Sequence, residues 1–217
     1  MNKQSSDFLK KILETPSPTG MEIEAQRIWA KYIAPYTDTQ ECDAYGSTWA
    51  TLRSKQEGAP TLMLDAHADE IGFSIRHITD DGFAYVERLG GSDVAIARGR
   101  RLRFFGKKGE VIGVIGNTAI HIRDDEGKAP KLWELYVDFG CRNREEVEAL
   151  GLRVGDRAVY CDGRSSSTTA PAWCAVRWMT ASAASSLLRR RAPSRSAGFP
   201  RRGISSLPTL CRRRWAA

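Results

Sequence analysis

The final quarter of the chain contains no Lys, Asp or Glu. Residues 164–217 carry eleven arginines, whereas the other residues hold 22 basic and 26 acidic side chains, so the net charge of +7 originates entirely in this segment. Its Leu, Ile, Val and Phe number only seven of 54, too few to bury against those charges. We therefore expect 163–217 to be a disordered Arg/Ser/Ala-rich tail, and the overall positive charge says nothing about the rest of the chain.

Other features are also missing. The five cysteines form no C-x-x-C pair, residues 1–7 lack the apolar core of a secretory signal, and no apolar run approaches the roughly 20 residues of a membrane span. These absences predict a reduced, cytoplasmic protein with no membrane partner.

A short apolar run precedes the most informative polar residues. Leu62–Asp65 is typical of a buried strand in a parallel sheet, with His67 and Asp69 following at its carboxyl end, where α/β folds place their sites. Positions i and i+2 of a strand point the same way, so Asp69 can accept the proton of one ring nitrogen while the other faces a metal. The alternative is a His and an Asp in a solvated turn.

Several motifs in a fixed order favour the metal site. They are Thr15-Pro-Ser-Pro-Thr-Gly-Met-Glu22, Asp43-Ala-Tyr-Gly46, Asp65-Ala-His-Ala-Asp-Glu-Ile-Gly-Phe73, His77-Ile-Thr-Asp-Asp-Gly-Phe83, Gly109-Glu-Val-Ile-Gly-Val-Ile-Gly116, Val137-Asp-Phe-Gly140 and Val154-Gly-Asp156. Together they resemble the tetrahedral aminopeptidase family of dinuclear metallopeptidases, also called glutamyl or deblocking aminopeptidases. The resemblance covers roughly residues 6 to 162, and departs from the family at Ser47, where Asn is expected.

The resemblance implies an α/β fold in three parts. Residues 1–72 would be the amino-terminal part of an incomplete metallopeptidase catalytic domain. Residues 73–162 would be an inserted β-rich domain that mediates homo-oligomerisation. The disordered tail at 163–217 completes the chain. Independently, short apolar runs broken by Gly or Asp-Gly between 73 and 160 predict a small antiparallel barrel or sandwich.

The resemblance also implies a reaction, hydrolysis of the amino-terminal peptide bond of a peptide substrate. Two divalent ions, zinc or cobalt, would activate a water, and a glutamate would take its proton. Of the five ligands that the family uses, this chain matches only His67, with Asp69 as the residue that orients it. The general base is absent, and the last two ligands would lie beyond Ala217. We expect the chain to bind no metal tightly and to be inactive as translated.

Periodicity predicts several further elements. Helices are expected over 7–14 and from Gly20 to Pro35, the second with a buried stripe that includes Ile23. A short helix is expected over Arg144–Leu150, with Val147 and Leu150 inward. His77 and His121 are expected to be structural. Further strands are expected at 39–43, 48–53, 73–78, 83–89, 102–105, 111–115 and 158–160.

The tail admits two interpretations. It could be an Arg-rich arm that binds nucleic acid, although natural arms usually mix Lys with Arg. Alternatively, it is translated out of frame. Trp178-Met179-Thr180 must be encoded by TGG-ATG-ACN, and a frame that starts at the third base of each codon reads this DNA as Asp-Asp. In the same shifted frame, the possible codons of Cys211–Ala216 permit the sequence Gln-Glu-Glu-Val-Gly. Both resemble ligand segments of the family.

A displaced frame beginning near Gly163 is therefore favoured, and nucleic acid is not expected as a partner. A third possibility is a non-catalytic interaction module, in which residues 73–162 join intact subunits.

Overall fold

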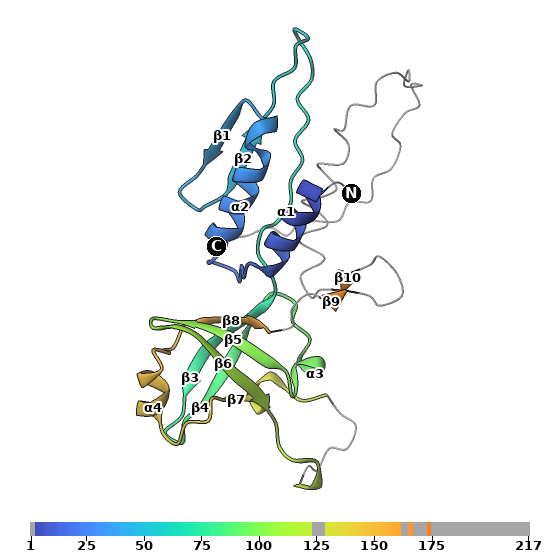
Figure 1. The fold of residues 1–217 in the computed structure, drawn as a ribbon. Coiled ribbons are helices and arrows are strands. Elements are labelled where there is room, and N and C mark those ends of the chain that lie inside the picture. Colours follow the sequence, from blue (N-terminus) through green and yellow to red (C-terminus); the bar gives the residue numbers. More distant parts are fainter. Residues whose placement is uncertain (1–2, 123–128, 162–164, 167–172, 175–217) are drawn as a thin grey trace.

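The computed structural model describes residues 3–122, 129–161, 165–166 and 173–174. Two helices and a two-stranded hairpin occupy one half of the molecule, and a closed barrel occupies the other (Figure 1). The chain is thus a mixed α/β protein whose amino-terminal elements stand beside a six-stranded barrel.

The two helices pack through an aromatic contact. Helix α1 spans Lys3–Glu14 and α2 spans Ile23–Ile33. Phe8 and Tyr32 stack with ring centroids 3.9 Å apart, and Leu9 and Leu13 are buried beside them. Helix α1 begins four residues earlier than expected, and Ile23 is exposed rather than buried. Gly20 has a φ of +86°, which lies outside the helical region, so α2 begins only after the turn.

A hairpin follows, after the 3₁₀ turn η1 (Ala34–Tyr36). Strands β1 (Thr39–Cys42) and β2 (Thr48–Thr51) pair antiparallel. The Asp43 carboxylate accepts from the amides of Tyr45 and Ser47 and so closes the connecting turn. Both strands confirm the sequence prediction.

The predicted buried strand at Leu62–Asp65 is wrong. Residues 61–69 belong to no strand, and Leu62, Met63 and Leu64 are 80%, 79% and 56% exposed. A central parallel strand needs hydrogen-bonding neighbours on its edges. Within the described residues, β1 and β2 pair only with each other and no strand pairs with this run, which stays extended and solvent-exposed.

The barrel resolves the choice between barrel and sandwich. Its strands close in the order β3-β4-β7-β6-β5-β8, all antiparallel. Alternate residues point inward, and Phe73, Ile75, Leu102 and Phe104 are at most 1% exposed. The strand bounds are β3 Gly72–Ile78, β4 Phe83–Leu89, β5 Arg101–Gly106, β6 Gly109–Gly116, β7 Tyr136–Asp138 and β8 Arg157–Tyr160.

The barrel connections contain short helices. Helix α4 confirms its prediction, because the Asn143 side chain accepts from the amide of Glu146 at 2.8 Å and Val147 is fully buried. Leu150, predicted inward, is exposed at the helix end. Strand β7 was not predicted, since three residues are too few to show alternation. The connecting elements are α3 Val94–Ala97, η2 Ile120–Ile122, η3 Leu132–Glu134 and α4 Arg144–Ala149.

The predicted disorder of 163–217 lies largely outside the described residues. The four that are described form a short antiparallel pair, β9 (Ser165–Ser166) with β10 (Trp173–Cys174). At these four positions the backbone is therefore extended and paired. Separately, no helix in the described ranges is both long and apolar enough to span a bilayer.

The barrel should be the most stable part of the chain, because it contains the large buried cluster whereas the helices bury few side chains. Limited proteolysis is expected to leave a resistant fragment containing residues 73–160. Phe104→Ala should cost about 3–5 kcal/mol and abolish that resistance. Phe8→Ala, the matched aromatic truncation in α1, should leave it intact. Recovery of residues 1–70 as the sole resistant fragment would contradict this assignment.

Candidate functional site

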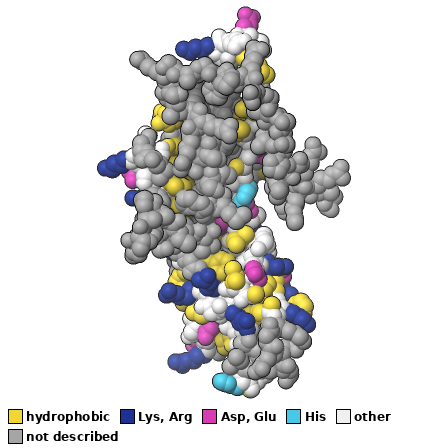
Figure 2. Space-filling model, turned by 90° about the vertical axis from the view of Figure 1, so that its right-hand side faces the viewer, with side chains coloured by type: hydrophobic (Ala, Val, Ile, Leu, Met, Phe, Trp, Pro, Cys, Tyr) yellow, Lys and Arg dark blue, Asp and Glu magenta, His cyan; other side chains and the backbone are white. Residues whose placement is uncertain are grey.

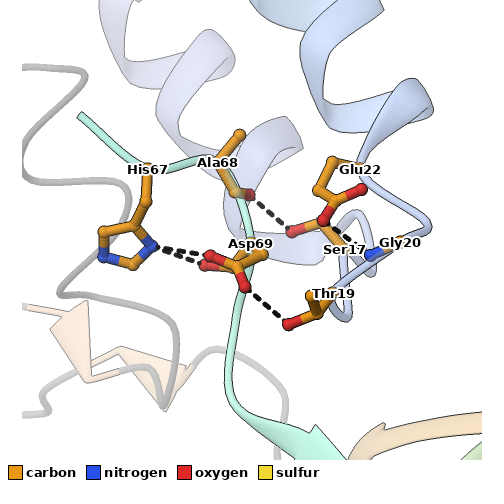
Figure 3. Close-up of polar contacts among 7 residues, drawn as sticks. All are labelled: Ser17, Thr19, Gly20, Glu22, His67, Ala68 and Asp69. Carbon is orange, nitrogen blue, oxygen red and sulfur yellow. Dashed lines mark hydrogen bonds and ion pairs between the residues drawn. The ribbon is translucent and has the colours of Figure 1, made fainter. Parts of the chain in front are cut away.

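Residues 67–70 lie against the turn between α1 and α2 (Figure 3). The Glu70 amide donates to the Ser17 carbonyl at 2.8 Å, and the Ser17 amide donates to Glu70 Oε1 at 2.9 Å. The Ser17 hydroxyl donates to the Ala68 carbonyl at 3.0 Å. Ser17 and Glu70 are 1% and 8% exposed, so these bonds are shielded from water. Two segments about 50 residues apart in sequence are thereby joined.

The His67 imidazole contacts Asp69 twice. Its Nδ1 lies 3.0 Å from Asp69 Oδ1 and 3.0 Å from the Asp69 carbonyl oxygen. Both neighbours are acceptors, so Nδ1 carries the proton. The ring is 61% exposed, and its Nε2 has no hydrogen-bond partner among the described residues. The contact arises in an extended segment rather than in the expected strand.

Thr19 holds the other side of the Asp69 carboxylate. Its hydroxyl donates to Asp69 Oδ2 at 2.6 Å, so the two carboxylate oxygens are divided between Thr19 and His67 (Figure 3). The Gly20 amide donates to Glu22 Oε1 at 2.6 Å, which closes the turn on its far side. The turn thus holds the Thr19 hydroxyl next to the Asp69 carboxylate.

The barrel supports this turn through β8. Arg157 Nε donates to the Thr19 carbonyl at 2.5 Å, and its Nη1 donates to the Gly155 carbonyl at 3.2 Å. Gly72 begins β3 directly after the site, and a Cβ there would lie 2.3 Å from the Ala158 carbonyl oxygen. Only glycine allows the chain to enter the barrel so close to β8.

The other candidate residues lie elsewhere. His77 is exposed on β3 and His121 is exposed in η2, and their expected structural role stays a prediction. Burial, with smaller contributions from Glu146 and Asp138, raises the pKa of the Cys141 thiol. That thiol is therefore protonated and weakly nucleophilic at neutral pH.

The residues present do not fit a zinc or dinuclear centre. A catalytic zinc site uses three protein ligands. Over the described ranges, no group of three or more His, Cys, Asp or Glu could hold a metal ion. Glu70 already accepts from the Ser17 amide, and Asp69 is shared between Thr19 and His67. His67 is left as a single imidazole with one carboxylate beside it.

Comparison with known proteins shows that this chain is similar to aminopeptidases. Residues 46–171 match the model of the M42 glutamyl aminopeptidase family. The lysyl aminopeptidase of Pyrococcus furiosus is 33% identical over 155 residues, which cover 69% of this chain and 43% of that protein. The chain therefore spans less than half the length of this curated relative.

Solved structures agree. The TET aminopeptidase of a marine sediment archaeon of the Thaumarchaeota superimposes with a TM-score of 0.70 at 30% identity, covering 77% of this chain and 47% of that one. A Pyrococcus horikoshii TET1 peptidase, described as assembling into a tetrahedron or a large octahedral shell, gives 0.63 at 30% identity, covering 74% and 48%. The chain belongs to the M42 glutamyl aminopeptidase family, a family of peptide hydrolases.

Sequence analysis missed the partners that surround Asp69. The stretch Thr15–Glu22 is recognisable as a motif, but its pattern predicts no role for Ser17 or Thr19, and no pattern marks Glu70 or Arg157. The signal was present only in part, since Ser-Pro-Thr-Gly predicts a turn with hydroxyl donors. Which carboxylate those donors reach depends on tertiary structure.

Glu70→Ala should loosen the joint between the two segments. The substitution leaves the buried Ser17 amide without an acceptor, at a cost of about 1–3 kcal/mol. Hydrogen exchange of the Ser17 amide should accelerate about tenfold or more. Glu70→Gln keeps an acceptor oxygen at the same place and should preserve most of the protection. Equal exchange in wild type and Glu70→Ala would show that this bond does not hold the turn.

Proposed function

We propose that this chain carries one fragment of an M42-type peptidase site and does not itself hydrolyse peptides. In this proposal the reaction of the lineage is removal of amino-terminal residues from peptides, assisted by two divalent ions, zinc or cobalt. One observation carries it. His67 has a single carboxylate beside it, no described cluster supplies a third donor, and the sequence contains no His, Asp or Glu after Asp162.

The missing metal ligands matter because metal-assisted hydrolysis of a peptide needs a bound metal ion and a general base. Additional metal ligands and a glutamate base cannot come from residues 163–217, whose only side chains of ligand type are Cys174 and Cys211. A lone imidazole, even one oriented by Asp69, falls short of the ligand number of a catalytic zinc. The role assigned to each residue is thus limited: His67 presents Nε2, and Asp69 holds its Nδ1–H.

The proposal includes a displaced reading frame after about Gly163. Two features support it. The charge and composition change abruptly there. The codons of Trp178-Met179 also force an Asp in the alternative frame. In that frame the carboxylates that this chain lacks would be encoded.

The partner that we propose is a second copy of this chain, bound through residues 73–162. Ile112 and Val114 are exposed on β6, opposite the inward-facing Gly113, and Figure 2 shows hydrophobic side chains next to basic ones on the barrel half. Similar structures are described as a dodecamer and as tetrahedral or octahedral shells. An interaction role of this kind does not require a complete metal site.

The purified chain should release no amino acids from short peptides when zinc or cobalt is supplied. A general base alone usually contributes about 10²–10⁴ in rate, so its absence should bring turnover below detection. His67→Ala should make no difference. Release that is abolished by His67→Ala would contradict the proposal.

The matched positive control is the same gene with the frame restored after codon 163. Its product should gain the two acidic segments and cleave amino-terminal residues under the same conditions. A locus whose alternative frame lacks those segments would return 164–217 to a genuine Arg-rich extension.

A further inference from the structure

A pocket of about 440 Å³ lies where the barrel meets the turn between α1 and α2. Its volume falls within the range of small-molecule sites, and the described residues that line it do not include His67 or Asp69. Met21 follows the turn, Phe105 belongs to β5, and residues 153–157 lead into β8 and begin it. Three separate segments of the chain therefore form its walls.

The charges on the pocket walls do not cancel. The guanidiniums of Arg153 and Arg157 and the carboxylate of Asp156 line it, so the pocket has one net positive charge at neutral pH. Both Asp156 oxygens already accept from Arg153, Oδ2 from its amide at 2.9 Å and Oδ1 from its Nε at 3.4 Å. The Asp156 side chain is only 10% exposed, so its carboxylate offers little surface to a cation of a ligand.

Arg157 is the charged group that lacks a counter-ion. Its guanidinium is half-buried, and it donates through Nε to the Thr19 carbonyl and through Nη1 to the Gly155 carbonyl. Both acceptors are neutral, and over the described ranges no ion pair joins Arg157 to a carboxylate. Among the described residues, the buried side-chain nitrogen without a hydrogen-bond partner is Arg103 Nε, so Arg157 Nη2, which makes no hydrogen bond there, is open to solvent. A guanidinium in this condition is suited to hold an anion.

The rest of the lining is apolar. Met21 and Val154 are 38% and 56% exposed, and the half-buried Phe105 completes this part of the wall. Covering these side chains with an apolar group removes them from water, which favours a ligand that has a hydrocarbon part as well as a negative charge. An inorganic anion would leave this surface exposed.

We propose that this pocket binds the carboxyl-terminal residue of a peptide when that residue has an apolar side chain. Arg157 Nη2 donates to the carboxylate, the charge of Arg153 adds to the attraction, and the apolar side chain lies against Met21 and Phe105. A free amino acid fits less well, because its ammonium would stand beside two guanidiniums and the lining carboxylate is already engaged. The inference does not rest on the proposed function, since it requires neither a metal nor His67.

The test titrates the nitrogen-15-labelled full chain, without metal, with N-acetyl-leucine and follows the backbone amides of Met21 and Gly155. This ligand has a carboxylate, an apolar side chain and no ammonium. It should shift both amides with a dissociation constant of about 1–10 mM, as expected for its size. N-acetyl-leucinamide lacks the charge and N-acetylglycine lacks the apolar side chain, so each should bind about tenfold more weakly. Free leucine should also bind more weakly.

Two substitutions at the pocket should act in opposite directions. Arg153→Gln removes a positive charge and should weaken binding about threefold to tenfold. Asp156→Asn removes the negative charge, keeps an oxygen for the Arg153 amide, and should strengthen binding by a similar factor. Arg27→Gln is the matched control, because Arg27 is a similarly exposed arginine in an i, i+3 ion pair, with Glu24, and does not line the pocket. Arg157 is not substituted, because its hydrogen bonds also join the barrel to the turn.

Three outcomes would overturn the inference: N-acetyl-leucine binding no more tightly than its amide or N-acetylglycine, free leucine binding as tightly as N-acetyl-leucine, or equal effects of Arg153→Gln and Arg27→Gln. If Asp156→Asn precipitates, the ligand comparisons and Arg153→Gln still decide. Unshifted Met21 and Gly155 amides would overturn this inference and leave the proposed function untouched. Peptide turnover by the chain would overturn the proposed function alone.

Discussion

The reciprocal hydrogen bonds between Ser17 and Glu70 are the constraint on which the rest of the arrangement depends. Each residue donates its amide to an oxygen of the other, in surroundings almost closed to water. Buried amides without acceptors are costly, so the two segments stay together as long as the chain is folded. Thr19 is thereby brought to Asp69, Asp69 to His67, and the chain is directed through Gly72 into the barrel.

This constraint holds the local arrangement together through hydrogen bonds among the described residues. The His-x-Asp segment and β8 lie within the residues that match the family model, whereas the turn between α1 and α2 precedes them. Their contacts with one another are hydrogen bonds within the protein. Catalysis, by contrast, needs donors from several elements at once, and the described residues bring only one imidazole to this place.

The sequence predicts best where a pattern is local. Five of the six barrel strands and helix α4 are predicted, because strand alternation and helical periodicity act over a few residues. The run at 62–65 was mispredicted since a buried strand is defined by neighbours, and hydrophobicity alone does not supply them. Gly72 and Arg157 were invisible for the same reason, because their importance lies in contacts with residues far along the chain.

The central claim is that this chain lacks a complete metal site, and the metal content of the purified chain tests it most directly. The purified full chain, equilibrated with zinc or cobalt and dialysed, should retain well below one ion per chain, and His67→Ala should retain the same amount. Such a result follows from an imidazole that has a carboxylate beside it but no third donor within the described residues. Retention of two ions per chain, lost in His67→Ala, would contradict the account and require a complete site in this polypeptide.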